Sequence, residues 1–238
     1  MAFHTTRWSL IARAAAPDEA GRRALAELCG DYWPPVYAFY RQSGIGTDDA
    51  RDLTQALFAD LLERGTLGAG GAIDGRFRNF LCGCARHFLA NHRDRERAQK
   101  RGGGRAPLPI DVDDEELRRA REPVDHLDPA RAFDRRWAQS LVEQALLATE
   151  RHERAAGRGE VFERLRPVLD GDGPDRPWAE LAAQWSTSEG ALRVAAHRLR
   201  ARFREQLLAL VRDTLGPADG PRDDEAELAE LLRALSGG

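Results

Sequence analysis

Lysine, cysteine and long apolar runs are scarce in this sequence, and each shortage excludes a class of protein. Lys100 is the single lysine among 36 basic residues, and Arg101 follows it. A nucleotide-binding P-loop requires lysine followed by serine or threonine, so a standard P-loop ATPase is excluded. The cysteines number 3, an odd count that builds no disulfide framework and that fits a reducing compartment. No apolar run approaches the roughly 20 residues that a membrane-spanning helix needs.

Several targeting and catalytic patterns are also missing. The first residues, MAFHTTRWSLIARAA, lack the charged start and unbroken apolar stretch of a signal peptide, so we expect a cytoplasmic protein that does not enter a membrane. There is no nucleophile-elbow pattern and no His-Glu-x-x-His motif. The glycines between residues 68 and 75 miss the dinucleotide-binding spacing, because Ile73 stands where the last glycine should be. We therefore expect no enzyme, no cofactor and no metal site.

Charge is sorted along the chain, although the formal net charge is only −3. Between Arg76 and Arg105, nine basic and two acidic residues give a net charge of +7. Between Asp111 and Asp128, eight acidic residues and three arginines give −5. Charge sorted in this way is typical of a polyanion-binding face beside a separate acidic segment.

Glycines and prolines divide the 238 residues into two blocks, which are long enough for two small cores. The first block spans residues 5–101 and the second spans residues 130–215. Residues 102–129 are rich in glycine, proline and acids and are typical of a flexible linker, and residues 216–238 form a C-terminal tail. There is little period-two alternation and no run of β-branched residues. We expect an all-α protein with two small helical domains joined by this acidic linker.

Two helices are predicted in the first block. A segment that begins at Asp48 carries a stripe of leucines beside a polar stripe, with acids at its start and Gly65 as its stop. Residues 77–101 form a basic helix in which Phe and Leu interleave with Arg and His. Aromatics between arginines suit core packing and also stacking on unpaired bases, and the net charge favours nucleic acid.

The second block contains a predicted helix-turn-helix. Residues 178–184 form its short first helix. Ser186 and Glu189 fit a capping box, in which the serine hydroxyl accepts from the backbone three residues on and the glutamate reaches back to the Ser186 N–H. On the long helix that follows, an apolar stripe lies beside a stripe of arginines, and small residues narrow the first turns. Such a slim basic end can enter the major groove of DNA.

The order of these blocks, with the basic helix first and the helix-turn-helix last, resembles that of the extracytoplasmic-function (ECF) sigma factors of the sigma-70 family. The segment DDARDLTQALF, residues 48–58, is similar to the stretch that grips the polymerase clamp helices in that family. Residues 77–101 are similar to its promoter-melting and minus-ten-reading helix, and residues 187–207 to its minus-thirty-five reader. Segments typical of a planctomycete and myxobacterial subgroup are TTRWSL (5–10), DYWPPVYAFYR (31–41) and FDRRWA (133–138).

The resemblance implies a transcription initiation factor that binds core RNA polymerase and directs it to promoter DNA. Residues 5–101 would be sigma domain 2, and residues 130–215 would be sigma domain 4. The implied upstream-box contacts are Ser188, Arg193, His197, Arg198, Arg200 and Arg204. The implied downstream-box contacts are Arg78, Arg86, His87, His92, Arg93 and Arg97. The implied polymerase contacts are Asp49, Asp52, Gln55, Phe58 and Glu63.

Two other hypotheses stay open. A freestanding helix-turn-helix regulator would bind duplex DNA tightly by itself, whereas a sigma factor would bind weakly without polymerase. A thiol or metal sensor would use Cys82, Cys84 and His87, although zinc normally takes four ligands and only two or three are near. An anti-sigma factor or a serine/threonine kinase would be a further partner, since phosphorylation at residues 186–188 would place negative charge beside the DNA.

Overall fold

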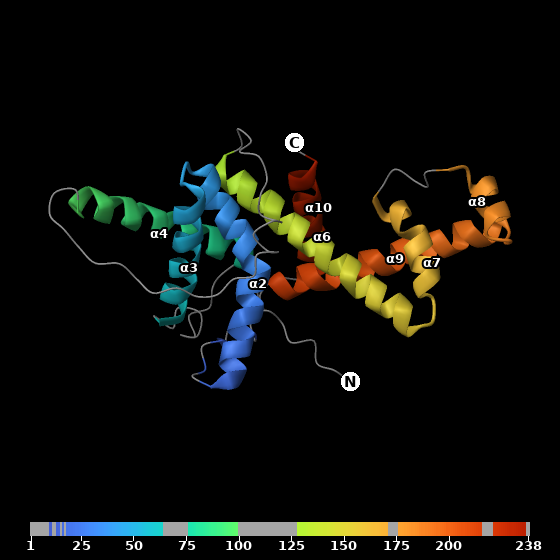
Figure 1. The fold of residues 1–238 in the computed structure, drawn as a ribbon, viewed down its shortest axis with the longest axis horizontal. Helices are drawn as coiled ribbons and strands as arrows, with labels where there is room; N and C mark the ends of the chain where they lie inside the picture. The colour runs from blue at the N-terminus through green and yellow to red at the C-terminus, as the bar shows by residue number, and fades with distance from the viewer. Residues whose placement is uncertain are drawn as a thin grey trace. The chain divides into compact units, whose positions relative to one another are not determined.

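The computed structural model of the protein describes residues 18–63, 76–99, 128–170, 176–215 and 221–236, together with a few isolated positions before Asp18. All regular elements in these ranges are helices (Figure 1), so the predicted all-α class is confirmed. None of these helices combines the length and the apolar character needed to cross a membrane. Gly65 and nearly all of the predicted linker lie outside the described residues.

The chain divides into two compact units. Unit 1 comprises Met1–Ser140 and Asp213–Gly238, and unit 2 comprises Leu141–Arg212. The two divisions fall inside helices α6 (Pro129–Ala155) and α9 (Glu189–Thr214). The C-terminal residues, which the sequence sets apart as a tail, therefore group with the N-terminal helices. The assignment of sigma domains to residues 5–101 and 130–215 stays a prediction.

Helices α2 (Glu19–Gln42), α3 (Thr47–Glu63) and α4 (Phe77–Gln99) contact one another in unit 1. Asp18 caps α2, because its carboxylate accepts from the Gly21 N–H at 2.7 Å. The first turn of α3 carries two acids, as predicted, at the end of the helix where the backbone dipole is positive. Unit 1 also contains the first part of α6 and the C-terminal helix α10 (Pro221–Leu235).

Helix α2 continues through two adjacent prolines, Pro34 and Pro35. Proline inside a helix removes a backbone hydrogen bond and clashes with the preceding turn. Both prolines are buried, and so are their neighbours Trp33 and Val36. The apolar surface that this segment removes from water offsets the loss of helical hydrogen bonds.

An aromatic cluster fixes the start of α6 in the core of unit 1. Trp137, whose exposed fraction is 1%, stacks on Tyr32 of α2 with the ring centroids 4.8 Å apart. Phe133 stacks on Trp137 at 5.7 Å, and Phe77 of α4 lies 6.1 Å from it. Such aromatic pairs contribute beyond the area that they bury. Three helices that are distant in the sequence thus share one packed centre.

Unit 2 is built on helix α7 (Gly159–Leu165), the short 3-10 helix η1 (Arg166–Asp170), helix α8 (Trp178–Gln184) and most of α9. Its core lies between α7, η1 and α9. The buried residues of this core are Phe162, Leu165, Val168, Ala196 and Leu199. The tryptophans at the two ends of α8 pack against it.

We predict that Trp137→Ala lowers the free energy of unfolding by about 3–5 kcal/mol, because it leaves a cavity among three helices. Urea denaturation followed by circular dichroism measures this loss. Leu147→Ala, on the same helix, is the matched control, since its side chain is 55% exposed. We expect it to change the free energy by less than about 0.5 kcal/mol. Equal losses in both variants would contradict the aromatic cluster's role.

Candidate nucleic-acid interface

The turn between α8 and α9 is four residues long, from Trp185 to Ser188. Ser186 has a φ of +52°, in the left-handed region. Its N–H donates to the Ala183 carbonyl at 3.3 Å, and the Thr187 N–H donates to the Ala182 carbonyl at 3.0 Å. This pair of bonds is the Schellman pattern that ends a helix, here with serine at the position where glycine is usual. The end of α8 therefore fixes where the turn begins.

The predicted capping box at Ser186 and Glu189 is wrong. Ser188 caps α9 instead, because its hydroxyl accepts from the Ala191 N–H at 3.1 Å and its carbonyl accepts from the Leu192 N–H at 3.1 Å. Ser186 cannot take that role, since its left-handed backbone already ends α8. The Glu189 carboxylate binds Arg193 rather than the backbone of Ser186.

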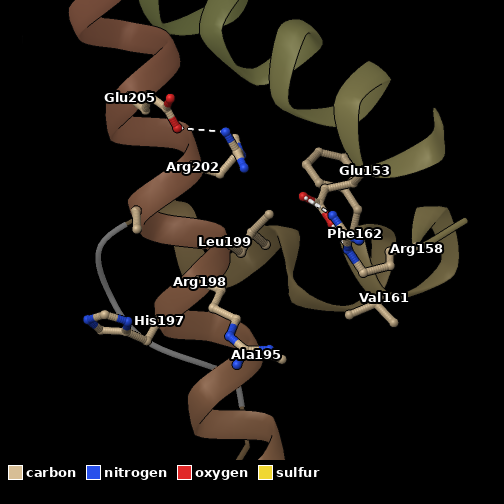
Figure 2. Close-up of a pocket in the computed structure, with 11 residues that line it drawn as sticks. Glu153, Arg158, Val161, Phe162, Ala195, His197, Arg198, Leu199, Arg202 and Glu205 are labelled. Carbon is tan, nitrogen blue, oxygen red and sulfur yellow. Dashed lines mark hydrogen bonds and ion pairs between the residues drawn. The ribbon is translucent and has the colours of Figure 1, made fainter. Parts of the chain in front are cut away.

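The residues predicted to contact the upstream box lie at the N-cap of α9 and along this helix. Ser188 and the five basic residues are all exposed: Arg193, His197, Arg198, Arg200 and Arg204. The side chains do not all share one direction. Figure 2 shows His197 and Arg198 leaving the helix on different sides, and Arg200 donates through Nε to the Val168 carbonyl at 3.2 Å.

Two tryptophans, Trp178 at the start of α8 and Trp185 directly after its end, each hold an arginine, which the sequence analysis missed. Arg193 donates through Nε and Nη2 to Glu189 Oε1 at 2.9 and 2.6 Å, and its Cζ lies 5.6 Å from the centroid of the Trp178 ring. At the other end of α8, the Cζ of Arg164 lies 5.3 Å from the Trp185 ring, and this arginine also binds a glutamate four residues earlier. The guanidiniums are thereby oriented before any ligand arrives.

A groove of about 560 Å³ lies between α9 on one side and the end of α6 and the start of α7 on the other (Figure 2). One wall carries Val161 and Phe162, and the other carries Arg198 and Arg202 of α9. Glu153 also lines it; a hydrogen bond from Arg158 holds the pKa of this carboxyl below its usual value. The groove mixes both signs of charge, so it is not a simple anion site.

Helix α4 presents four of the predicted downstream-box residues to solvent. These exposed residues are Arg86, His87, Arg93 and Arg97. His92 is half-buried. Arg93 also donates to the Ser43 carbonyl at 2.8 Å, which directs this side chain toward the turn after α2.

Arg78 does not share this exposed face. Its exposed fraction is 3%, and its guanidinium donates to the carboxylates of Asp134 on α6 and Glu227 on α10. These carboxylates raise the pKa of the guanidinium, although burial alone would lower it. With α10 in this position, Arg78 is a core ion-pairing residue and not an accessible DNA contact.

The predicted polymerase contacts on α3 fall into two groups. Asp49, Asp52 and Glu63 are exposed and are available to a partner. Gln55 and Phe58 are buried, with exposed fractions of 8% and 4%. Phe58 packs against the Trp33 ring of α2 with the centroids 6.3 Å apart, so it stabilises the contact of α3 with α2.

The cysteines of α4 lie in surroundings that keep their thiols protonated. Burial, with a smaller contribution from Asp60, raises the pKa of Cys84 to about 11, and burial also raises the pKa of Cys82. A reactive thiol needs a lowered pKa, so these surroundings do not favour a thiol sensor. Within the described ranges, no group of three or more His, Cys, Asp or Glu side chains is placed to hold a metal ion.

We predict that Ser188→Ala lowers the free energy of unfolding by about 1 kcal/mol, because the cap of α9 is lost. Urea denaturation measures the change. Thr187→Ala, one residue earlier and also exposed, is the control and should change it by less than about 0.5 kcal/mol. If Thr187→Ala were the more costly variant, the cap would lie elsewhere.

Comparisons with known proteins found no relative of this chain. No protein-family model matches the chain, and no curated protein or solved structure matches it either. The function is therefore argued from the sequence resemblance and from the arrangement of α4, α8 and α9.

Proposed function

We propose that the protein is a transcription initiation factor of the ECF sigma type, which binds core RNA polymerase and directs it to specific promoters. The observation that carries the proposal is the exposed basic face of α9, which begins directly after the four-residue turn that follows α8. A short helix, a tight turn and a longer helix with exposed arginines are the parts of a helix-turn-helix reader.

The N-terminal turns of α9 suit the major groove. Gly190, Ala191 and Val194 are exposed and small, so they add little width to a helix that has to enter a groove about 12 Å wide. Arg193 lies among them, held by Trp178 and Glu189. In the proposal, its guanidinium leaves Glu189 for a guanine edge or a phosphate, and the aromatic face keeps it oriented.

Helix α4 is the proposed face for the downstream box. Its exposed Arg86, Arg93 and Arg97 lie within the stretch of net charge +7. Unpaired bases can stack on aromatic and arginine side chains, and a cationic helix guides the strand backbone. The exposed acids Asp49, Asp52 and Glu63 of α3 are the proposed polymerase contacts, and this role comes from the family resemblance.

We predict that the protein gives discrete new start sites in run-off transcription with bacterial core RNA polymerase on a genomic promoter library. Arg193→Ala should reduce these products about tenfold or more, because a good bidentate base contact contributes about 1–3 kcal/mol of discrimination. Sequencing of the transcripts maps the start sites and so reveals both promoter boxes.

Arg202→Ala is the matched control for this experiment. Arg202 lies on the same helix about two and a half turns further on, so it faces the opposite side, where it pairs with Glu205. We expect it to retain most of the activity. If no start sites appear while the protein alone shifts duplex DNA, a freestanding regulator replaces the sigma factor as the function.

We further predict that Arg86→Ala impairs transcription from duplex promoters more strongly than from a template in which the downstream box is already unpaired. The reason is that α4 is proposed to act when the duplex opens, and unpairing bases costs a few kcal/mol. Arg193→Ala should stay defective on both templates. Equal defects of Arg86→Ala on both templates would assign α4 another role.

A further inference from the structure

The C-terminal helix α10 is joined to the start of α4 by ion pairs, of which the pair between Arg78 and Glu227 is buried on both sides. Arg78 donates through Nε to Glu227 Oε1 at 3.0 Å and through Nη2 to Glu227 Oε2 at 3.2 Å. Arg76 Nη1 lies 2.6 Å from the same carboxylate and also binds Glu230. Asp134 of α6 accepts from Arg78 Nη1 at 2.7 Å. The Glu227 side chain is 0% exposed, so the two arginines, rather than water, balance its charge.

Most of the carboxylates in these ion pairs come from α10. In these ion pairs, three carboxylates (Asp134, Glu227 and Glu230) bind two guanidiniums (Arg76 and Arg78). Two of these three carboxylates belong to α10, so undocking of α10 would leave Asp134 as the remaining one of the three. Burial raises the pKa of Glu230, but hydrogen bonds from Arg76 and Arg78 outweigh burial and hold it below its usual value. The Glu230 carboxylate is therefore bound as an anion.

The geometry of this junction suits phosphate as well as carboxylate. A guanidinium presents its N–H groups as a fork that matches either anion with two parallel bonds. Arg78 uses that fork on Glu227. The same helix continues with exposed Arg86 and Arg93, so a nucleic-acid strand that follows α4 toward its N-terminus meets the place that α10 occupies.

Helix α10 depends on this contact for its structure. It has 15 residues, a length at which an isolated helix is marginal in water. Leu228 and Leu231 are buried beside the two glutamates, so undocking would expose them. Docking of α10 onto α4 and the folding of α10 into a helix are therefore coupled. Weakening the ion pairs destabilises both the docked contact and the helix.

We propose that α10 and single-stranded nucleic acid compete for Arg76 and Arg78, so that docked α10 lowers the affinity of α4 for nucleic acid. The proposal rests on the proposed function only in taking α4 as a nucleic-acid face. Glu227 and Glu230 occupy the position of two backbone phosphates. A strand that binds α4 displaces them, and α10 in turn excludes strands that bind too weakly to displace it.

The test is the binding of a fluorescein-labelled, mixed-sequence single-stranded DNA oligonucleotide to the full chain, measured by fluorescence anisotropy at several salt concentrations. Glu227→Gln with Glu230→Gln should tighten binding about fivefold or more at low salt. The slope of log K against log salt should steepen by about 0.7 for each additional phosphate that the protein neutralises. Adding Arg76→Gln and Arg78→Gln to this variant should abolish the tighter binding.

A matched control separates competition from net charge. Glu19→Gln with Glu205→Gln removes the same two charges from exposed pairs with Arg23 and Arg202. It should tighten binding much less than the α10 variant. Equal effects in the two variants would overturn the proposal, as would tighter binding that persists without the two arginines or an oligonucleotide that binds no variant.

A second measurement uses the unaltered chain, in case the α10 variant does not fold. Hydrogen exchange at residues 221–235 should accelerate when the oligonucleotide saturates the protein, because the strand displaces α10. Unchanged protection at saturation would overturn the proposal. Neither measurement uses polymerase, so a failure in run-off transcription and a failure of the competition remain distinguishable.

Discussion

The stacking of Trp137 on Tyr32 determines which parts of the chain share a core. The stack holds the start of α6 against α2, and the rings of Phe133 and Phe77 also pack against Trp137. Buried aromatic rings of this size remove a large apolar area from water, so few alternatives compete with this arrangement. Asp134 follows Phe133 directly, and packing of that phenylalanine brings the carboxylate to the start of α4. An apolar contact thus places the first of the anions that bind the arginines there.

Arginine does more at these contacts than lysine would. In unit 2, one face of Arg193 lies over an indole ring while its edge donates to Glu189. A planar guanidinium can stack and donate at the same time, whereas an ammonium group offers only a point charge. Exposed pairs of this kind contribute little to stability, typically below about 1 kcal/mol. Their effect is orientation: the side chain that the proposed function places in the major groove is already extended beside Trp178.

Local signals in the sequence predicted α3, α4, α8 and α9, but they did not predict how these helices contact the rest of the chain. The short helix at 178–184 was predicted with its observed bounds, because its ends are set by neighbouring residues. The cap was placed two residues early, since Ser186 and Ser188 offer the same chemistry and only the left-handed backbone of the first distinguishes them. The burial of Arg78 had no local signal at all. Its partner Glu227 is 149 residues away, in the segment that the sequence sets apart only as a C-terminal tail.

Glutamate at position 227 is not the residue that would stabilise the docked helix α10 most. Helix α10 already buries Leu228 and Leu231, and a third apolar residue in place of Glu227 would avoid the desolvation of a charge. Replacing a buried ion pair with apolar residues of similar volume is often neutral or stabilising. An apolar contact between α10 and α4, however, would leave no arginine–carboxylate bonds that the phosphates of a nucleic acid could replace. The carboxylates of α10 accept the same kind of arginine hydrogen bonds that backbone phosphates would accept. A strand of sufficient charge could therefore displace them. Under the proposed competition, the buried glutamate exchanges some stability for a contact that a polyanion can replace.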